Sequence, residues 1–190
     1  MTTNAALSEK TNARLQAIAT PLADTHDTVI ARLLDHWEQT KGKYPKVTKP
    51  GEPIEILSDG KMVFDATNLP NLGFTTPKQM IIDGVRLPQS DTYWNSLLNL
   101  MIRRVHAKGK DAESILAMLN VANAALGMKN DNGYKFLPDV GLSVQGQDSN
   151  AAFRQAYELA IANGIKGSVF FIWQNNEKAV YPNTPGIIEF

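Results

Sequence analysis

Apolar and polar positions alternate with a helical period over the first forty residues. After Ser8 the apolar positions recur every three or four residues, which predicts a helix over residues 8–22 with Ser8 as its N-cap. A second helix is expected to follow Thr25, its N-cap, and to run to about residue 37. The apolar positions that define the two helices are Leu15, Ile18, Ala19 and Leu22, then Val29, Ile30, Leu33, Leu34 and Trp37. Two such helices bury too little surface to fold alone, so the rest of the chain or a second copy must cover them.

Residues 39–53 break this pattern. Their glycines and prolines exclude a regular helix, and we interpret the segment as an interdomain linker. Four lysines give it positive charge, with no acidic residue between Glu38 and Glu52. The segment is either a solvated spacer or a strap that contacts phosphates. Its lysines are Lys41, Lys43, Lys46 and Lys49.

Residues 54–190 carry both helical and strand patterns. Asp59-Gly60 and Asp83-Gly84 lie between short apolar runs and predict two hairpins. Helices are expected over 92–105, from Asp111 to about 126, and from a cap at Asp148 or Ser149 to about 162. Strands are expected over 134–145 with an interruption at Pro138, over 168–174 and 178–181, and over 187–190, where the last closes the sheet.

The predicted fold class is therefore α+β. It comprises a helical dimerisation module over residues 1–38, a basic linker over 39–53 and an α/β domain over 54–190. That domain is expected to hold a small mixed or antiparallel sheet and about three helices.

Composition narrows the class of protein. A hydrophobic fraction of 43% excludes a largely disordered chain, and the absence of Cys excludes disulfides, thiolate nucleophiles and Cys-based zinc sites. Lys+Arg and Asp+Glu both number 19, but residues 61–130 hold 8 basic and 5 acidic residues, a net charge of +3. The sequence shows neither a membrane-spanning run nor the apolar core of a signal peptide, so we expect a cytoplasmic protein without a membrane partner.

The N-terminal pattern resembles the ribbon-helix-helix family. Leu7 matches the last inward residue of that family's strand, and Ser8-Glu9-Lys10 matches the start of its first helix. The segment from Thr25 to Ile30 matches the opening of the second helix, and Leu33-Leu34 matches its core. The resemblance implies an obligate homodimer whose paired strands enter the DNA major groove, with a phosphate held at the start of the second helix, here Thr25.

The expected strand departs from the DNA-reading members of this family. Its outward residues would be Thr2, Asn4 and Ala6, and it carries no Arg or Lys. Asn4 can pair with adenine, but two such side chains in a dimer give modest affinity. The layout also resembles that of the SeqA family of replication-control proteins, in which a similar N-terminal module self-associates and a separate C-terminal domain binds DNA. Because the strand offers little hydrogen-bonding power and no charge, we expect the C-terminal domain to discriminate among DNA sequences or modifications.

Two groups of residues in the larger domain are candidates for contacting DNA. The first group lies at the end of the helix over 92–105 and either complements the helix dipole or binds phosphates; it contains Arg103, Arg104, His106, Lys108 and Lys110. The second is the amide-rich segment from Ser143 to Asn150, which joins a strand to a helix. Either its Gln145 and Gln147 present amides to a phosphate or a base edge, or the segment is a well-capped turn.

No cofactor, metal site or catalytic residue is expected. His26, His36 and His106 show no metal-binding spacing, and no Gly-rich phosphate-binding motif is present. Pro138-Asp139 opens a nuclease-like pattern that the next strand does not complete. We therefore expect a DNA-binding homodimer with a role in transcription regulation, replication control or defence. The alternatives are a protein-interaction or assembly module that does not bind DNA and, more weakly, a nuclease-related enzyme.

Overall fold

A computed structural model describes residues 8–19, 24–40, 49–120, 123–129 and 131–190, and for residues 10, 18 and 36–40 it describes the backbone alone. The chain divides into a smaller unit, Met1–Val47, and a larger unit, Thr48–Phe190. The strand expected before Ser8, with Thr2, Asn4 and Ala6, lies outside the described residues, as do Lys41, Lys43 and Lys46.

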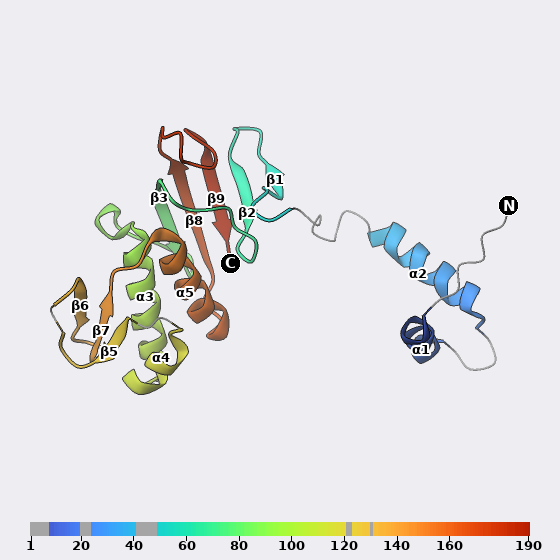
Figure 1. Cartoon of the computed structure of the whole chain (residues 1–190), viewed down its shortest axis with the longest axis horizontal. Helices are drawn as coiled ribbons and strands as arrows, with labels where there is room; N and C mark the ends of the chain where they lie inside the picture. Colours follow the sequence, from blue (N-terminus) through green and yellow to red (C-terminus); the bar gives the residue numbers. More distant parts are fainter. Residues whose placement is uncertain (1–7, 20–23, 41–48, 121–122, 130) are drawn as a thin grey trace. The chain divides into compact units, whose positions relative to one another are not determined.

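The smaller unit holds helices α1 (Glu9–Ile18) and α2 (His26–Thr40) (Figure 1). The Ser8 hydroxyl accepts the Thr11 N–H at 3.3 Å, so the predicted N-cap of α1 is confirmed. Helix α1 ends four residues before its predicted end at residue 22, because Ala19 is already extended. Helix α2 continues three residues beyond its own predicted end at residue 37. Among the described side chains, Leu15 and Val29 alone form the buried apolar interior of this unit.

The larger unit mixes helices and strands, as the α+β prediction requires. Its main sheet has the strand order β1-β2-β9-β8-β3-β4, and a second sheet has the order β5-β7-β6. All pairs are antiparallel except β2 with β9. The main-sheet strands are β1 (Glu55–Ile56), β2 (Met62–Asp65), β3 (Thr75–Ile82), β4 (Val85–Arg86), β8 (Gly167–Trp173) and β9 (Pro185–Glu189). The second sheet consists of β5 (Ala124–Leu126), β6 (Tyr134–Leu137) and β7 (Leu142–Gln145).

Helices α3 (Trp94–Ala107) and α5 (Ser149–Ala162) lie side by side in the larger unit (Figure 1). The 3-10 helix η1 (Gln89–Asp91) precedes α3, and the short helix α4 (Ala112–Met118) follows it. Asp111 opens α4 as predicted, and of the two predicted caps of α5 the structure has Asp148; each caps its helix through its carboxylate. Of the helices in the described part of the chain, none combines the length and the apolar character that crossing a membrane requires.

Aromatic side chains join the main sheet to α3 and α5. The ring of Phe171 lies 4.8 Å from that of Trp173 and 5.7 Å from that of Trp94, centroid to centroid. Trp94 also packs edge-on against Phe153 of α5, and its indole N–H donates to the Thr75 hydroxyl at 2.9 Å. Such pairs each contribute about 0.5–1.5 kcal/mol beyond the burial of their area, so this cluster fixes the helices on one face of the sheet.

The opposite face of the main sheet carries apolar side chains that lie outside this core. Strand register places Val63, Ile187 and Phe170 in one row across β2, β9 and β8. All three are half-buried and belong to neither the buried core nor the side chains packed on it. The prediction that β8 is a central strand with two apolar faces is confirmed, but the described helices of the larger unit cover only one of those faces.

Three predicted elements differ in the structure. The helix from Asp111 ends at Met118 rather than near 126, because Ala124–Leu126 pairs instead with β7 as strand β5. The interrupted strand over 134–145 is a hairpin of β6 and β7 that turns at residues 138–141, where Gly141 takes a φ of +80°. Residues 178–181 form no strand, and Tyr181 packs its ring against Trp173 instead.

The two hairpins predicted from Asp-Gly pairs are confirmed. Ile82 pairs directly with Val85, which leaves Asp83 and Gly84 as a two-residue turn with φ values of 49° and 78°. A two-residue turn with positive φ at both positions has a backbone twist that matches the twist of the strands it joins. The predicted closing strand is also present, as β9, but it lies inside the sheet between β2 and β8.

Gly186→Ala is expected to destabilise the larger unit by about 1–3 kcal/mol, because the added Cβ would overpack the core. A Cβ at this position would lie 2.5 Å from the buried ring of Phe171. Gly146→Ala is the control, since no atom lies within 4 Å of its added Cβ, and its effect should stay within about 0.5 kcal/mol. Urea unfolding of both variants measures the difference, and equal stabilities would contradict this account of β9.

Candidate nucleic-acid interface

The predicted cations at the end of α3 form the basic cluster, defined as Arg103, Arg104, Lys108 and Lys110. Arg103 donates through Nε to Asp139 at 2.8 Å, in the turn between β6 and β7. Arg104 places Nη1 3.6 Å from the carboxylate of Asp83, in the turn between β3 and β4. The two neighbouring arginines therefore point toward different turns, and their side chains remain 40% and 35% exposed.

The two lysines of the basic cluster differ in their contacts. Lys108 donates through Nζ to the main-chain oxygen of Asn163 at 2.7 Å, at the end of α5. This contact places a cation at the negative end of that helix dipole. Lys110 is exposed, and its contacts are through the main chain: its N–H donates to the Val105 oxygen at 3.4 Å, and its oxygen lies 2.8 Å from Nδ1 of His106. The Lys110 ammonium is thus the cation of the cluster most open to a ligand.

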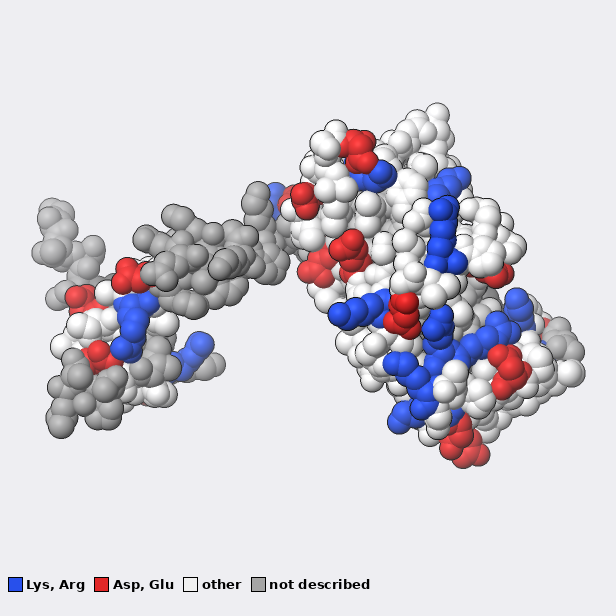
Figure 2. Space-filling view, turned by 180° about the vertical axis from the view of Figure 1, so that it is seen from behind, with Lys and Arg blue, Asp and Glu red and all other residues white. Residues whose placement is uncertain are grey.

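Carboxylates stand among these cations. Slight burial raises the pKa of Asp139, but the hydrogen bond from Arg103 and the charges of Arg103 and His106 lower it by more. The pKa of Asp111 is lowered by its hydrogen bonds with Ser114 and by the charge of Lys110. Both groups stay ionised at neutral pH, so the basic cluster is partly neutralised. Figure 2 shows Asp and Glu side chains between the Lys and Arg side chains on one face of the larger unit.

The amide-rich turn after β7 is occupied by internal hydrogen bonds. Gln145 donates through Nε2 to the Asn132 main-chain oxygen at 2.6 Å, and Gln147 donates through Nε2 to that of Gln145 at 2.9 Å. Asn95, near the start of α3, accepts the Gln147 N–H through Oδ1 and donates through Nδ2 to its main-chain oxygen, both at 2.8 Å. The side-chain donors predicted to read base edges are therefore engaged within the protein.

The other end of this turn is tied to the loop before β3. Asn150 accepts the Leu72 N–H through Oδ1 at 2.7 Å, and Ser149 donates its hydroxyl to the Leu72 main-chain oxygen at 2.9 Å. Asp148 meanwhile caps α5 by accepting the N–H groups of Asn150 and Ala151. These contacts make the turn a structural joint between three segments of the larger unit.

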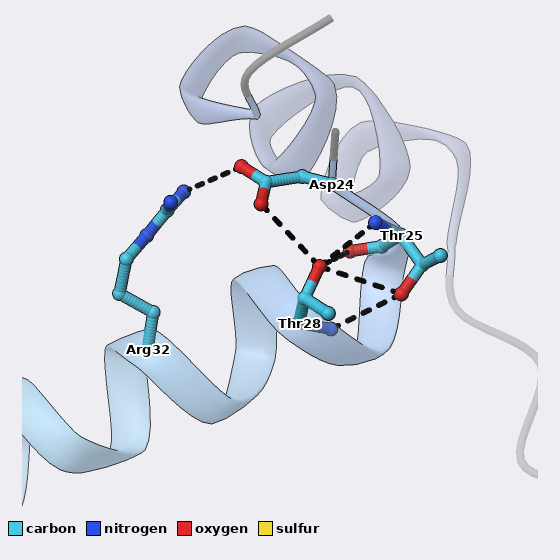
Figure 3. Close-up of polar contacts among 4 residues, drawn as sticks. All are labelled: Asp24, Thr25, Thr28 and Arg32. Carbon is cyan, nitrogen blue, oxygen red and sulfur yellow. Dashed lines mark hydrogen bonds and ion pairs between the residues drawn. The ribbon is translucent and has the colours of Figure 1, made fainter. Parts of the chain in front are cut away.

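The start of α2, where the resemblance places a phosphate at Thr25, is already capped (Figure 3). Thr25 accepts the Thr28 N–H through its hydroxyl at 3.2 Å, and Thr28 accepts the Thr25 N–H through its own at 2.8 Å. Beside them Asp24 forms an ion pair with Arg32 at 3.0 Å. A phosphate at this position would have to compete with the reciprocal cap and with a neighbouring carboxylate.

The structure does not gather the predicted DNA-contacting residues into one surface. Gln147 lies by the first turn of α3, and the two arginines of the basic cluster lie about two turns later, roughly 12–14 Å further along the helix axis at the rise of an α-helix. Lys49 is 86% exposed and lies 4.0 Å from Glu52, while the following main chain packs on the larger unit through the Tyr181 hydroxyl, which donates to the Gly51 oxygen. Residues 49–53 of the predicted linker thus belong to the larger unit.

Two cavities lie near these groups. The larger, of about 430 Å³, lies between α5 and residues 66–72 and includes Asn150, whose amide is already engaged. The smaller, of about 130 Å³, lies over α3 and is lined by Arg103 together with Asn99 and Lys135, which the sequence did not single out. Asn99 resembled an ordinary polar position between apolar ones, and Lys135 is 32 residues from Arg103, so local pattern gave no signal for either.

Within the described residues, no three His, Asp or Glu side chains gather where they could hold a metal ion. Comparisons of the chain with protein-family models, curated proteins and solved structures found no match.

Asn95→Ala is expected to destabilise the larger unit by about 1–3 kcal/mol, because it leaves the main-chain N–H and oxygen of Gln147 without their partner. Gln145→Ala removes one exposed hydrogen bond and should cost less than about 1 kcal/mol. Urea unfolding compares the two variants. If Asn95→Ala were as stable as the unaltered chain, the turn would be held by other contacts.

Proposed function

We propose that this protein binds DNA as a homodimer, in transcription regulation, replication control or defence. The observation that carries the proposal is the basic cluster, which places four cations within residues 103–110. Both lysines and both arginine side chains of this cluster are at least one-third exposed. Clustered Lys and Arg on one element are the electrostatic footprint of a phosphate-binding surface.

The ion pairs within the cluster do not oppose this role. An exposed pair contributes about 0–1 kcal/mol, so a DNA phosphate can replace Asp139 or Asp83 as the partner of an arginine at little cost. An arginine fork also binds a phosphate through two parallel hydrogen bonds, which a single Nε contact to a carboxylate does not use. The carboxylates then serve to hold the arginines extended before DNA arrives.

The smaller unit supports the homodimer. Leu33 and Leu34 of α2 are 44% and 55% exposed, although their unit has only Leu15 and Val29 buried among its described side chains. A cavity of about 250 Å³ beside Leu33 is lined by Thr11, Arg14 and Leu15. Burying the exposed part of each leucine stabilises a dimer by roughly 1 kcal/mol. In a dimer with twofold symmetry, each chain covers the leucines of the other. A ribbon-helix-helix-like dimer is the arrangement that we propose for it.

Dimerisation increases the affinity of a weak phosphate-binding surface. Two basic clusters joined in one molecule make the second contact with DNA effectively intramolecular, which raises the overall affinity without new contacts. The partly neutralised cluster of one chain therefore suffices as half of a bivalent binder.

A protein-interaction or assembly module is the second candidate, and one observation favours it. The row of Val63, Ile187 and Phe170 forms an apolar stripe on the sheet face that the described helices of the larger unit leave uncovered. All three side chains are partly exposed, and contiguous apolar surface of this kind is typical of interaction sites. Absence of DNA binding in the following measurements would favour this candidate.

Lys110→Gln is expected to weaken binding to any DNA sequence and to flatten the slope of log K against log salt by about 0.9 for each phosphate that the variant no longer neutralises. Lys178→Gln removes the same charge from an exposed lysine after β8 and should leave the slope unchanged. Fluorescence anisotropy with labelled duplexes at several salt concentrations measures both slopes. Equal slopes for the two variants would remove the basic cluster from the interface.

Leu33→Asp is expected to raise the dissociation constant of the dimer by at least about a hundredfold, because an unpaired charge would be buried at the interface. Ala31→Asp adds the same charge at an exposed position about 160° around α2 from Leu33 and should leave the dimer intact. Sedimentation of the full chain distinguishes the two outcomes. A dimer that is unaffected by Leu33→Asp would assign the interface to another surface.

A further inference from the structure

The cavity of about 130 Å³ over α3 lies where three elements meet. The outward side of α3 forms its floor, the segment that follows β4 forms one wall, and β6 contributes from the second sheet. Its polar lining consists of Asp91, Ser96, Asn99, Arg103 and Lys135, and its apolar lining of Leu87 and Leu100. None of the roles described above uses the cavity itself.

Asn99 is the unusual member of this lining. Its residue is only 9% exposed, yet none of the described residues forms a hydrogen bond with its side-chain amide. Among the described residues, no fully enclosed side-chain nitrogen or oxygen lacks a partner, so the Asn99 amide keeps its small exposure where it lines the cavity. Polar groups in folded interiors are almost always paired, and Asn95, one turn earlier on α3, has both amide atoms engaged. The contrast indicates that the Asn99 donor and acceptor are directed toward a ligand in the cavity.

The charged members of the lining are arranged around this amide. Arg103 is held by Asp139 through Nε alone, which leaves the donors of its two terminal nitrogens available. Lys135 adds a second cation, and Asp91 adds a carboxylate. A bare phosphate would be repelled by Asp91 and would not use the leucine walls. A planar heterocycle with both donors and acceptors on its edge satisfies every group, and Leu87 and Leu100 can cover its apolar surfaces.

We infer that this cavity accepts a single unpaired nucleobase of the bound DNA, a step that rests on the proposed function. Proteins that recognise a base flipped out of the DNA stack hold it in a close-fitting pocket through hydrogen bonds to the edge of the base. Adenine ranks first among the bases, because a side-chain amide pairs its donor and acceptor with that base. The attached phosphate stays outside, next to the exposed Arg103 and Lys135 side chains.

The test compares two duplexes of the same sequence, one fully paired and one with a single unpaired adenine, bound to the full chain at low and moderate salt. The unaltered protein should bind the duplex with the unpaired adenine about tenfold more tightly. Asn99→Leu should abolish this preference while leaving the affinity for paired DNA unchanged, and Asn99→Ala serves if the leucine variant does not fold. Gln89→Leu, which removes an exposed amide of η1 outside the lining, should keep the preference.

Each failure has a distinct meaning. Equal affinity for the two duplexes, or a preference that survives both Asn99 variants, would overturn the inference and leave the proposed function standing. If neither duplex binds, the proposed function fails, and the cavity is then probed with millimolar adenosine by NMR. Adenosine-induced shifts at Asn99 and Leu100 that Asn99→Ala abolishes would uphold the base site, and their absence would overturn it.

Discussion

The paired hydrogen bonds between Asn95 and the main chain of Gln147 join α3 to the end of β7, and Arg103 repeats the connection two turns later through Asp139. On its other side α3 packs Trp94 against Phe171 of the main sheet. The helix is therefore held by polar contacts on one side and by apolar contacts on the other. Because α3 carries both arginines of the basic cluster and much of the lining of the small cavity, this attachment fixes the positions of both.

The division between the two sides has a physical reason. The core side needs shape and apolar area, which Trp94, Leu98 and Ile102 supply with almost no exposure. The side that faces the second sheet uses directional contacts, which fix register without filling space. Polar groups on that side are mostly satisfied, and Asn99 stands apart because its residue is largely buried while its amide has no partner among the described residues. A group of this kind adds little to the stability of the unliganded protein, and the proposed base site depends on it.

Local chemistry made much of the fold predictable from the sequence. The caps at Ser8, Asp111 and Asp148 and the turn at Asp83-Gly84 depend on a few adjacent residues, and the structure has each of them. Pairing between distant segments was not predictable in the same way. Residues 124–126 follow a helical period but form a strand because β7 offers them a partner.

In the candidate site, too, the sequence predicts the features that depend on adjacent residues and misses the contacts between distant segments. The sequence identifies the cations of the basic cluster, since they lie within eight consecutive positions. It does not reveal that Asp139 and Asp83 reach them from separate turns, nor that Lys135 and Asn99 share a cavity. For Gln145 and Gln147 the sequence left two interpretations open, and the contacts of Asn95 and Asn132 explain the turn structurally.

Strand β9 has a consequence for how the chain folds. It lies between β2 and β8, so the hairpin of β1 and β2 joins the main sheet only through a strand about 120 residues further along the chain. During synthesis, β2 therefore emerges long before its parallel neighbour exists, and its apolar Phe64 has no sheet to enter. Closing so long a loop is slow relative to local pairing, so the main sheet is complete only once β9 lies between β2 and β8.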